Sequence, residues 1–210
     1  MIKSMNFSTA QEEFWFGEFG NEYISRANTN QYLASNLNFF SRAFNKIQKP
    51  NSLIEFGANV GFNLKAIKQL FPNIELTAVE INKSASVTLS DFLGKENVFN
   101  ISKLDYNTPK KFDIALIKLV LIHINPEMLP TVYEKLYQSS NKYILIAEYY
   151  NPSPVTVNYR GHNDRLFKRD FSGELLEMYD DLELIDYGFV YKRDNVFPLD
   201  DVTWFLLEKK

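Results

Sequence analysis

The chain has 210 residues, of which 45% are apolar and 23% are charged, and its formal net charge is −3. This composition is typical of one soluble globular domain, and the weak negative charge excludes the basic footprint of a nucleic-acid-binding protein. The absence of Cys excludes disulfides, zinc–thiolate sites and a Cys nucleophile, and the presence of only two His residues argues against a His-rich metal site.

The amino-terminal residues carry no targeting or membrane signal. Met1 to Asn6 lack an apolar core, and no apolar run in the chain approaches the length of a membrane span. We therefore expect a cytoplasmic protein without a membrane or nucleic-acid partner.

Two helices are predicted before the first strand. The segment 7–23 contains two capping-box spacings, Ser8 with Gln11 and Thr9 with Glu12, and should end near residues 17–20. Apolar residues three or four apart predict a longer helix over 31–47. Residues 1–48 would form a helical extension that either closes over a ligand as a lid or only packs on the core. The lid residues would be Trp15, Phe16, Tyr23 and Arg26.

A strand, a glycine-containing turn and a helix are predicted over residues 52–71. The apolar strand passes through Glu55 and turns at Gly57 and Gly61, which permit backbone angles that side chains would block. A helix that begins beside such a turn points its free N–H groups at the turn, as in parallel sheets that bind nucleotide-like cofactors. The alternative is an ordinary strand-to-helix turn without a ligand.

The spacing of the glycines separates two classes of cofactor. In the dinucleotide fingerprint G-x-G-x-x-G, the second and third glycines would fall at Asn59 and Phe62, which disfavours a bound pyrophosphate. The pattern Glu55-x-Gly57-x-Asn59-x-Gly61 instead resembles motif I of class I S-adenosylmethionine-dependent methyltransferases, with Asn59 in place of the middle glycine.

The second strand, predicted over 75–82, carries Glu80 about 20 residues after the glycine turn. A carboxylate there can accept both hydroxyl hydrogens of a ribose, which NAD and S-adenosylmethionine share, so Glu80 does not separate the two cofactors. Ile81 would offer an apolar surface to the adenine. The alternative is that Glu80 only stabilises the N-terminus of a helix that begins near Lys83.

Helices and strands alternate along most of the remaining chain. We predict helices over 85–93, 125–139 and 171–179, and strands over 97–101, 112–118, 141–148, 182–191 and 201–208. This pattern predicts a single Rossmann-like α/β domain, with helices on both faces of a mostly parallel seven-stranded sheet. The two late strands lack an intervening helix, which predicts an antiparallel last strand. Ser102 and Lys103 follow the strand 97–101, where the adenine would lie.

Residues 149–171 form a long segment at the carboxyl end of the fifth strand, on the edge where ligands bind in such sheets. Loops of this length inside a compact domain are usually functional. We interpret the segment as a substrate loop, and the alternative is a solvated charge run paired with Asp164 and Asp170. Its basic side chains are Arg160, His162, Arg165, Lys168 and Arg169.

Six stretches are similar to a small family of methyltransferases associated with pseudaminic acid biosynthesis, a bacterial nonulosonic-acid pathway. They are residues 11–23 (QEEFWFGEFGNEY), 55–61 (EFGANVG), 118–126 (KLVLIHINP), 148–152, 159–162 and 167–171. Asn59 in the glycine turn resembles the usual residue of this group. The resemblance implies the class I fold, S-adenosylmethionine as methyl donor with S-adenosylhomocysteine as product, and an acidic sugar or nucleotide sugar as acceptor.

The motifs and the resemblance together give a set of candidate binding residues. The cofactor candidates are Glu55, Gly57, Asn59, Gly61, Glu80, Ile81, Ser102, Lys103, Lys118 and Tyr23. The acceptor candidates are Arg160, Lys168, Arg169, Tyr149 and Asn151, and their cations would bind a carboxylate or a phosphate.

Methyl transfer from a sulfonium is an in-line displacement with a neutral leaving group, so we expect no metal. The acceptor atom has to be held on the order of 3–3.5 Å from the methyl group. A hydroxyl or ammonium acceptor also has to lose a proton, for which His is suited near neutral pH. We prefer His162 in the substrate loop as this base, and the second candidate is His123, whose alternative role is a structural hydrogen bond.

Three other functions fit parts of the pattern. One is an NAD(P)-dependent sugar-modifying enzyme, which the glycine register and the two late strands disfavour. Another is a non-catalytic cofactor-binding partner of a sugar-pathway enzyme. The third is a nucleic-acid amino-methyltransferase, whose signature Asn151-Pro152-Ser153-Pro154 would imitate, but this stretch follows the fifth strand instead of the fourth and ends in Pro. The sequence carries no signal for the oligomeric state.

Overall fold

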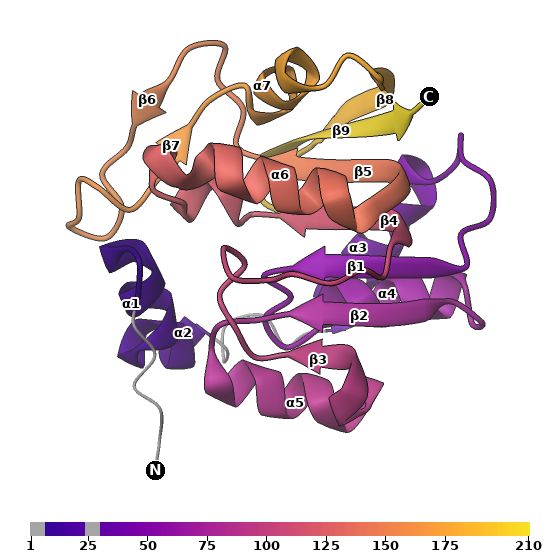
Figure 1. Cartoon of the computed structure of the whole chain (residues 1–210), viewed down its shortest axis with the longest axis horizontal. Coiled ribbons are helices and arrows are strands. Elements are labelled where there is room, and N and C mark those ends of the chain that lie inside the picture. Colours follow the sequence, from indigo (N-terminus) through magenta and orange to yellow (C-terminus); the bar gives the residue numbers. More distant parts are fainter. Residues whose placement is uncertain (1–6, 24–29) are drawn as a thin grey trace.

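The structure, a computed structural model, describes residues 7–23 and 30–210 of the chain. Within these residues, one sheet of seven strands has the order β3-β2-β1-β4-β5-β9-β8 (Figure 1). The first five strands pair in parallel, and β9 is antiparallel to both of its neighbours. The predicted parallel sheet with an antiparallel last strand is therefore confirmed. The strands are β1 (Ser52–Phe56), β2 (Glu75–Val79), β3 (Val98–Phe99), β4 (Phe112–Lys118), β5 (Ser140–Glu148), β8 (Leu182–Val190) and β9 (Val202–Lys209).

Helices cover both faces of the sheet. Successive residues of one strand point to opposite faces, and β1 shows the result: Leu53 packs in the core layer beneath α3, α4 and α5, whereas Ile54 packs beneath α6 and α7. The central strand β4 is buried on both faces, which accounts for its continuous apolar run. The helices are α3 (Asn30–Ala43), α4 (Phe62–Leu70), α5 (Lys83–Leu93), α6 (Leu129–Ser139) and α7 (Phe171–Met178).

The amino-terminal segment forms two short helices where one was predicted, α1 (Ala10–Phe16) and α2 (Glu18–Tyr23), because Gly17 between them is extended. Of the two possible capping boxes, the one between Thr9 and Glu12 forms. The N–H of Glu12 donates to Oγ1 of Thr9 at 3.2 Å, and the N–H of Thr9 donates to Oε2 of Glu12 at 3.2 Å.

Three other predicted elements differ in length or kind. The third strand is shorter than the predicted 97–101, because a 3-10 turn occupies residues 95–97 and pairing with β2 ends at Phe99. The helix predicted over 31–47 ends at Ala43. The long segment after β5 was predicted as a loop, but it contains a small antiparallel hairpin, β6 (Val155–Thr156) and β7 (Phe167–Lys168).

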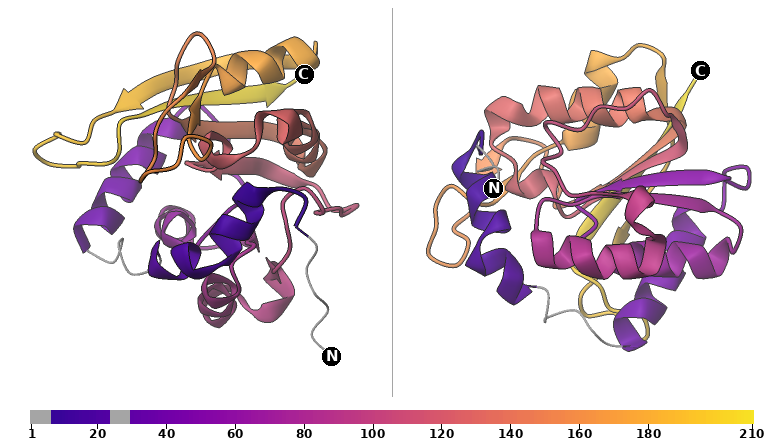
Figure 2. Two further views of the ribbon diagram at one scale, coloured as in Figure 1. Left: turned by 90° about the vertical axis from the view of Figure 1, so that its left-hand side faces the viewer. Right: turned by 60° about the horizontal axis from the view of Figure 1, so that its bottom comes forward.

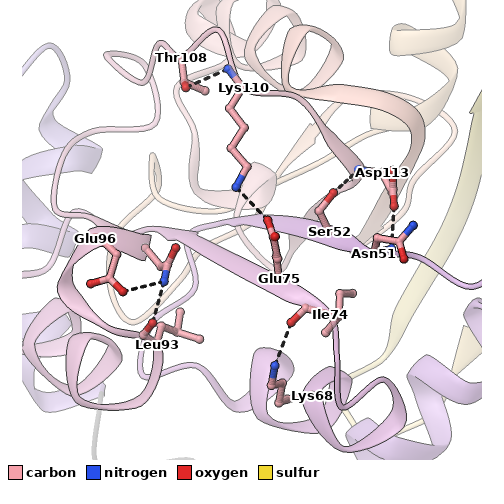
Figure 3. A network of polar contacts seen from close by, with 11 residues as sticks. Asn51, Ser52, Lys68, Ile74, Glu75, Leu93, Glu96, Thr108, Lys110 and Asp113 are labelled. Carbon is pink, nitrogen blue, oxygen red and sulfur yellow. Dashed lines mark hydrogen bonds and ion pairs between the residues drawn. The ribbon is translucent and has the colours of Figure 1, made fainter.

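The two ends of the sheet have different coverings. The carboxyl ends of β1, β2 and β3 face α1, α2 and the β6–β7 hairpin, which lie side by side in front of the strand ends when seen from that side (Figure 1; Figure 2, left panel). The amino ends are joined by surface contacts (Figure 3), in which Oδ2 of Asp113 accepts the N–H of Asn51 at 2.6 Å and Lys110 pairs with Glu75 at 3.1 Å. No helix in the described ranges combines the length and apolar character that a membrane crossing requires.

Candidate functional site

A cavity opens at the carboxyl ends of β1, β2 and β4. Its walls are the glycine turn after β1, the residues after β2, residues 101–104 except Ser102, and the segment that follows β4. The helices α1, α2 and α3 close it from the side, through Gln11, Glu12, Trp15, Gly20 and Tyr32. Of the predicted cofactor residues, Gly57, Asn59, Glu80, Ile81, Lys103 and Lys118 line this cavity.

The glycine turn needs the backbone freedom that its sequence provides. Gly57 and Gly61 have φ values of 77° and 80°, and a Cβ on Gly57 would lie 2.6 Å from the side chain of Val120. Asn59 also has a positive φ, 49°. Asn tolerates this left-handed conformation better than other residues with a side chain. Asn59 therefore preserves the backbone shape that the middle glycine of the motif would have.

Glu80 lies at the cavity wall just after β2, as predicted. Its Oε2 accepts the N–H of Asn59 at 2.7 Å, and its Oε1 accepts the N–H of Asn82 at 2.7 Å. Burial raises the pKa of this carboxyl, and the two N–H donors and Lys103 oppose the shift. Because a carboxylate oxygen has more than one acceptor position, Glu80 retains acceptor capacity toward the cavity. Asn82 caps α5, so Glu80 also lies beside a helix N-terminus.

A second polar cluster lies at the end of β1 and β4. Glu55 is fully buried, and its Oε1 accepts Nδ2 of Asn63 at 2.6 Å. Within the described part of the chain, Oε2 of Glu55 and Oδ1 of Asn63 have no hydrogen-bond partner. Burial raises the pKa of the Glu55 carboxyl to about 7, and Asn63 and the Lys118 ammonium oppose the shift.

Lys118 and helix α3 complete this cluster. The Lys118 ammonium, at the end of β4, lies 5.7 Å from the centre of the Tyr32 ring and 5.9 Å from that of Phe39. Asn36 lies on the same helical face, between these two aromatic residues. Asn36 is fully buried, and its amide has no hydrogen-bond partner among the described residues. Sequence reasoning missed Tyr32, Asn36 and Asn63, which were placed only as helix residues.

Three predicted cofactor residues do not line the cavity. Glu55 and Gly61 are not among the lining residues, and Ser102 is held by Glu12, whose carboxylate accepts a hydrogen bond from the Ser102 hydroxyl. Glu12 is itself buried and lines the cavity. The side chains of Tyr23 and Arg26 lie outside the described residues.

On the side of the cavity away from the sheet, helix α1 contacts the β6–β7 hairpin. Nε2 of Gln11 donates to the carbonyl oxygen of Asp164 at 2.9 Å. The His123 ring lies between Trp15 and Tyr159, with ring centres 4.8 and 5.1 Å away. The predicted lid residue Trp15 thus lines the cavity, whereas Phe16 packs outward against Phe7.

The two His residues have different positions. His123 is buried, lines the cavity and contacts the carbonyl oxygen of Arg165 through Nδ1 at 2.6 Å. Burial lowers its pKa to about 4, so the ring is neutral at pH 7. His162, which sequence reasoning preferred, is exposed, lies outside the cavity lining and contacts the edge of Phe14. His162 lies in the turn of the β6–β7 hairpin, outside the cavity lining. The path of this hairpin cannot be predicted from the sequence.

The predicted acceptor residues are spread along residues 149–169, and none of them lines the cavity. Arg160 lies over the rings of Phe19 and Tyr159, and Lys168 lies over Tyr149; neither cation forms an ion pair with the described residues. Of the predicted internal pairs, Arg165 pairs with Asp164, whereas Arg169 pairs with Glu174 at 2.5 Å and Asp170 caps α7. Asn151 donates to the carbonyl oxygen of Ser153 at 2.6 Å and so stabilises its own turn.

Several solved structures resemble this chain. The 1,6-didemethyltoxoflavin N1-methyltransferase from Burkholderia thailandensis, bound to S-adenosylhomocysteine, is 15% identical with a TM-score of 0.67, over 95% of this chain and 87% of that chain. The magnesium protoporphyrin IX methyltransferase from Synechocystis, bound to S-adenosylmethionine, is 10% identical with a TM-score of 0.68, over 98% and 100%. A plantazolicin methyltransferase is 16% identical with a TM-score of 0.62, over 96% and 95%. The chain has the class I methyltransferase fold.

Comparisons of sequence detect no relative, whereas comparisons of structure detect many proteins of the same fold. No protein-family model matches the chain, and no curated protein matches its sequence. At identities of 10–17%, the likeness to the solved structures describes the fold, and the site has to be interpreted from its own residues.

Proposed function

We propose that this protein is an S-adenosylmethionine-dependent methyltransferase that acts on a small acidic acceptor, a sugar acid or nucleotide sugar of a nonulosonic (pseudaminic) acid pathway. The methyl donor is supported by the cavity and by the fold, and the acceptor by the resemblance in sequence and by the cations on the hairpin.

The observation that carries the proposal is the chemical difference between the two ends of one cavity. At one end the Glu80 carboxylate, with Ile81 beside it, suits a ribose diol and an adenine. At the other end Lys118 can bind a carboxylate, and Oδ1 of Asn63, which has no partner among the described residues, can accept from an ammonium. A nucleoside joined to an amino acid matches both ends, whereas a dinucleotide has no ammonium group for the oxygen of Asn63.

The neighbours of known structure are consistent with a small acceptor. Their names describe methyltransferases of 1,6-didemethyltoxoflavin and of plantazolicin, and the corresponding structures contain the acceptor or an analogue of it together with S-adenosylhomocysteine. On the β6–β7 hairpin, Arg160 and Lys168 form no ion pair with the described residues, and they favour an acceptor with a carboxylate or a phosphate.

The proposed mechanism assigns proton transfer to His123. S-adenosylmethionine would supply an electrophilic methyl group carried on a sulfonium. Because a carbonyl oxygen only accepts, the contact with Arg165 requires a hydrogen on Nδ1 of His123, which leaves Nε2 of the neutral ring with a free lone pair. Nε2 of His123 would take the proton of the acceptor hydroxyl as that oxygen received the methyl group, and the electrons of the broken S–CH3 bond would stay with the sulfur of the donor. Trp15 and Tyr159 contact the imidazole ring and hold it in place.

The test is transfer of a labelled methyl group from S-adenosylmethionine to a panel of acceptors. The panel pairs each acidic sugar or nucleotide sugar with its neutral counterpart. We expect labelled product with acidic members only, and Arg160→Ala should raise the KM for them while Arg193→Ala, in the turn between β8 and β9, should not. Labelling of neutral acceptors alone would contradict the acceptor class. No labelling despite binding of S-adenosylhomocysteine would favour the non-catalytic partner.

A further inference from the structure

A buried carboxylate, that of Glu148, lies at the end of β5 and does not line the cavity. Glu148 is 2% exposed and ends the strand next to β4. Its Oε1 accepts the N–H groups of Val120 and Leu121 at 2.9 Å each, and its Oε2 accepts the N–H of Ile122 at 3.4 Å. One side chain thus satisfies three successive backbone donors that would otherwise be buried without partners.

The turn that Glu148 holds has an unfavourable backbone conformation. Leu119, its first residue, has a φ of 57°, in the left-handed region that bulky residues avoid. Such a conformation persists only where the surrounding contacts fix it. The contacts here are the Glu148 carboxylate and the carbonyl oxygen of Ala147, which accepts the N–H of Leu119 at 2.9 Å. Both come from the end of β5.

This turn leads directly to His123. The N–H of His123 donates to the carbonyl oxygen of Val120 at 3.0 Å, which closes the 3-10 turn η3 (Leu121–His123). The imidazole ring of His123 also contacts the carbonyl oxygen of Arg165 through Nδ1. The ring can keep this contact only while the turn holds its backbone in place.

We propose that Glu148 is a positioning residue for methyl transfer, whose carboxylate fixes the turn after β4 and thereby holds the His123 imidazole in the cavity. The role of Glu148 in catalysis rests on the proposed function. Its effect on the position of the His123 imidazole can be measured without any substrate. Glu148 does not line the cavity, so its substitution removes no direct contact to a ligand there.

The experiment depends on the fact that the chain contains only two His residues, His123 and His162. In a His162→Gln background, His123 is the single imidazole, and nitrogen–proton correlation NMR at pH 7 reports its tautomer. We expect the Nδ1–H form in this parent protein. Glu148→Ala should give a mixture of tautomers, and Glu148→Gln should give a smaller change, because its carbonyl oxygen can still accept from Val120 and Leu121.

The matched control is Asp113→Asn, which alters a carboxylate that accepts a backbone N–H at the opposite end of β4 (Figure 3) and should leave the His123 signals unchanged. Circular dichroism and S-adenosylhomocysteine binding show that each variant is folded. Should Glu148→Ala fail to fold, Glu148→Gln carries the test. An unchanged His123 tautomer and shift in a folded Glu148 variant would overturn the proposal.

Turnover separates this proposal from the proposed function. With an acidic acceptor, Glu148→Ala should lower kcat by about 10²-fold, the cost of misplacing a reacting group by about 1 Å, while binding of S-adenosylhomocysteine is kept. In a His123→Ala background the same substitution should have little further effect, and additive losses would contradict positioning through His123. A changed tautomer in a protein without any methyl transfer would reject the methyltransferase function alone.

Discussion

Oε2 of Glu80 accepts the backbone N–H of Asn59 at 2.7 Å and so ties the end of β2 to the glycine turn after β1. The two residues were predicted separately, one as a ribose acceptor and the other as a departure from a glycine motif. Their contact shows that they form one unit. The carboxylate fixes the turn through this N–H, and Asn59 adopts the positive φ that the turn requires at the same position.

Asn59 should tolerate replacement by Gly but not by a β-branched residue. Val at φ 49° would be strained in the left-handed region, and Asn59→Val should lower the free energy of unfolding by about 1–2 kcal/mol. Asn59→Gly keeps the conformation and the N–H donor. Urea unfolding of the two variants measures the difference, and equal stability would show that the turn does not need a left-handed residue here.

Glu80→Gln should weaken S-adenosylhomocysteine binding by about 10- to 100-fold, because a hydrogen bond to a charged group contributes about 1.5–3 kcal/mol. The control is Glu75→Gln at the other end of β2, where the carboxylate is exposed and pairs with Lys110 (Figure 3). Isothermal titration calorimetry measures both variants. A loss of affinity that is the same in both would exclude a specific role for Glu80.

Stability should fall with rising pH because of Glu55. Burial raises its pKa from 4.5 to about 7, so the folded state keeps a proton that the unfolded state has already lost. The free energy of unfolding that Glu55 contributes is therefore fully present below pH 4.5 and is lost as the pH rises to about 7. His123, with a pKa lowered to about 4, has the opposite effect, since its contribution is present at neutral pH and is lost in acid.

The two effects are separated by substitution. Relative to Glu55→Gln, which does not titrate, the wild type should become less stable between pH 5 and pH 8, and urea unfolding at the two values measures this. A stability difference between wild type and variant that does not change with pH would mean that Glu55 titrates normally in the folded protein.

The strands and helices of the sheet were predictable because buried strands and amphipathic helices leave periodic patterns in the sequence. Phe112–Lys118 matched the prediction at both ends because its buried run is continuous. Glu80 and Gly57 were found because strand–turn–helix spacing is local. Glu148 is also an acid at the end of a buried strand, so the signal that identified Glu80 could have identified it as well.

Other site residues left no local signal. Glu12 contacts Ser102, which is 90 residues away in the sequence. In the sequence Glu12 already had a structural role in the capping box, so nothing indicated that it also belongs to a binding site. Tyr32 and Asn63 meet Lys118 and Glu55 only when α3 and α4 pack on the same face of the sheet. The choice between His123 and His162 depended on the path of the β6–β7 hairpin, which is set by contacts with α1.

The contact between α1 and the strand ends can be tested with neighbouring acids. Glu12→Gln should weaken S-adenosylhomocysteine binding, because Glu12 lines the cavity and holds Ser102. The capping box should survive, since the carbonyl oxygen of Gln can accept the same backbone N–H. Glu13→Gln, on the exposed side of the same helix, should leave the affinity unchanged. Unchanged affinity in Glu12→Gln would indicate that α1 only packs and is not part of the binding site.

The most direct test of the central claim is thermal unfolding with S-adenosylhomocysteine, with NAD and NADP as controls. A ligand at about 100 times its Kd stabilises a protein by about 2.7 kcal/mol, and each kcal/mol raises the Tm of a domain of this size by about 2–4 °C. We predict a clear rise in Tm with S-adenosylhomocysteine and none with either dinucleotide. A rise with NAD or NADP alone would contradict the account, since the Lys118 end of the cavity would then have been assigned to the wrong ligand.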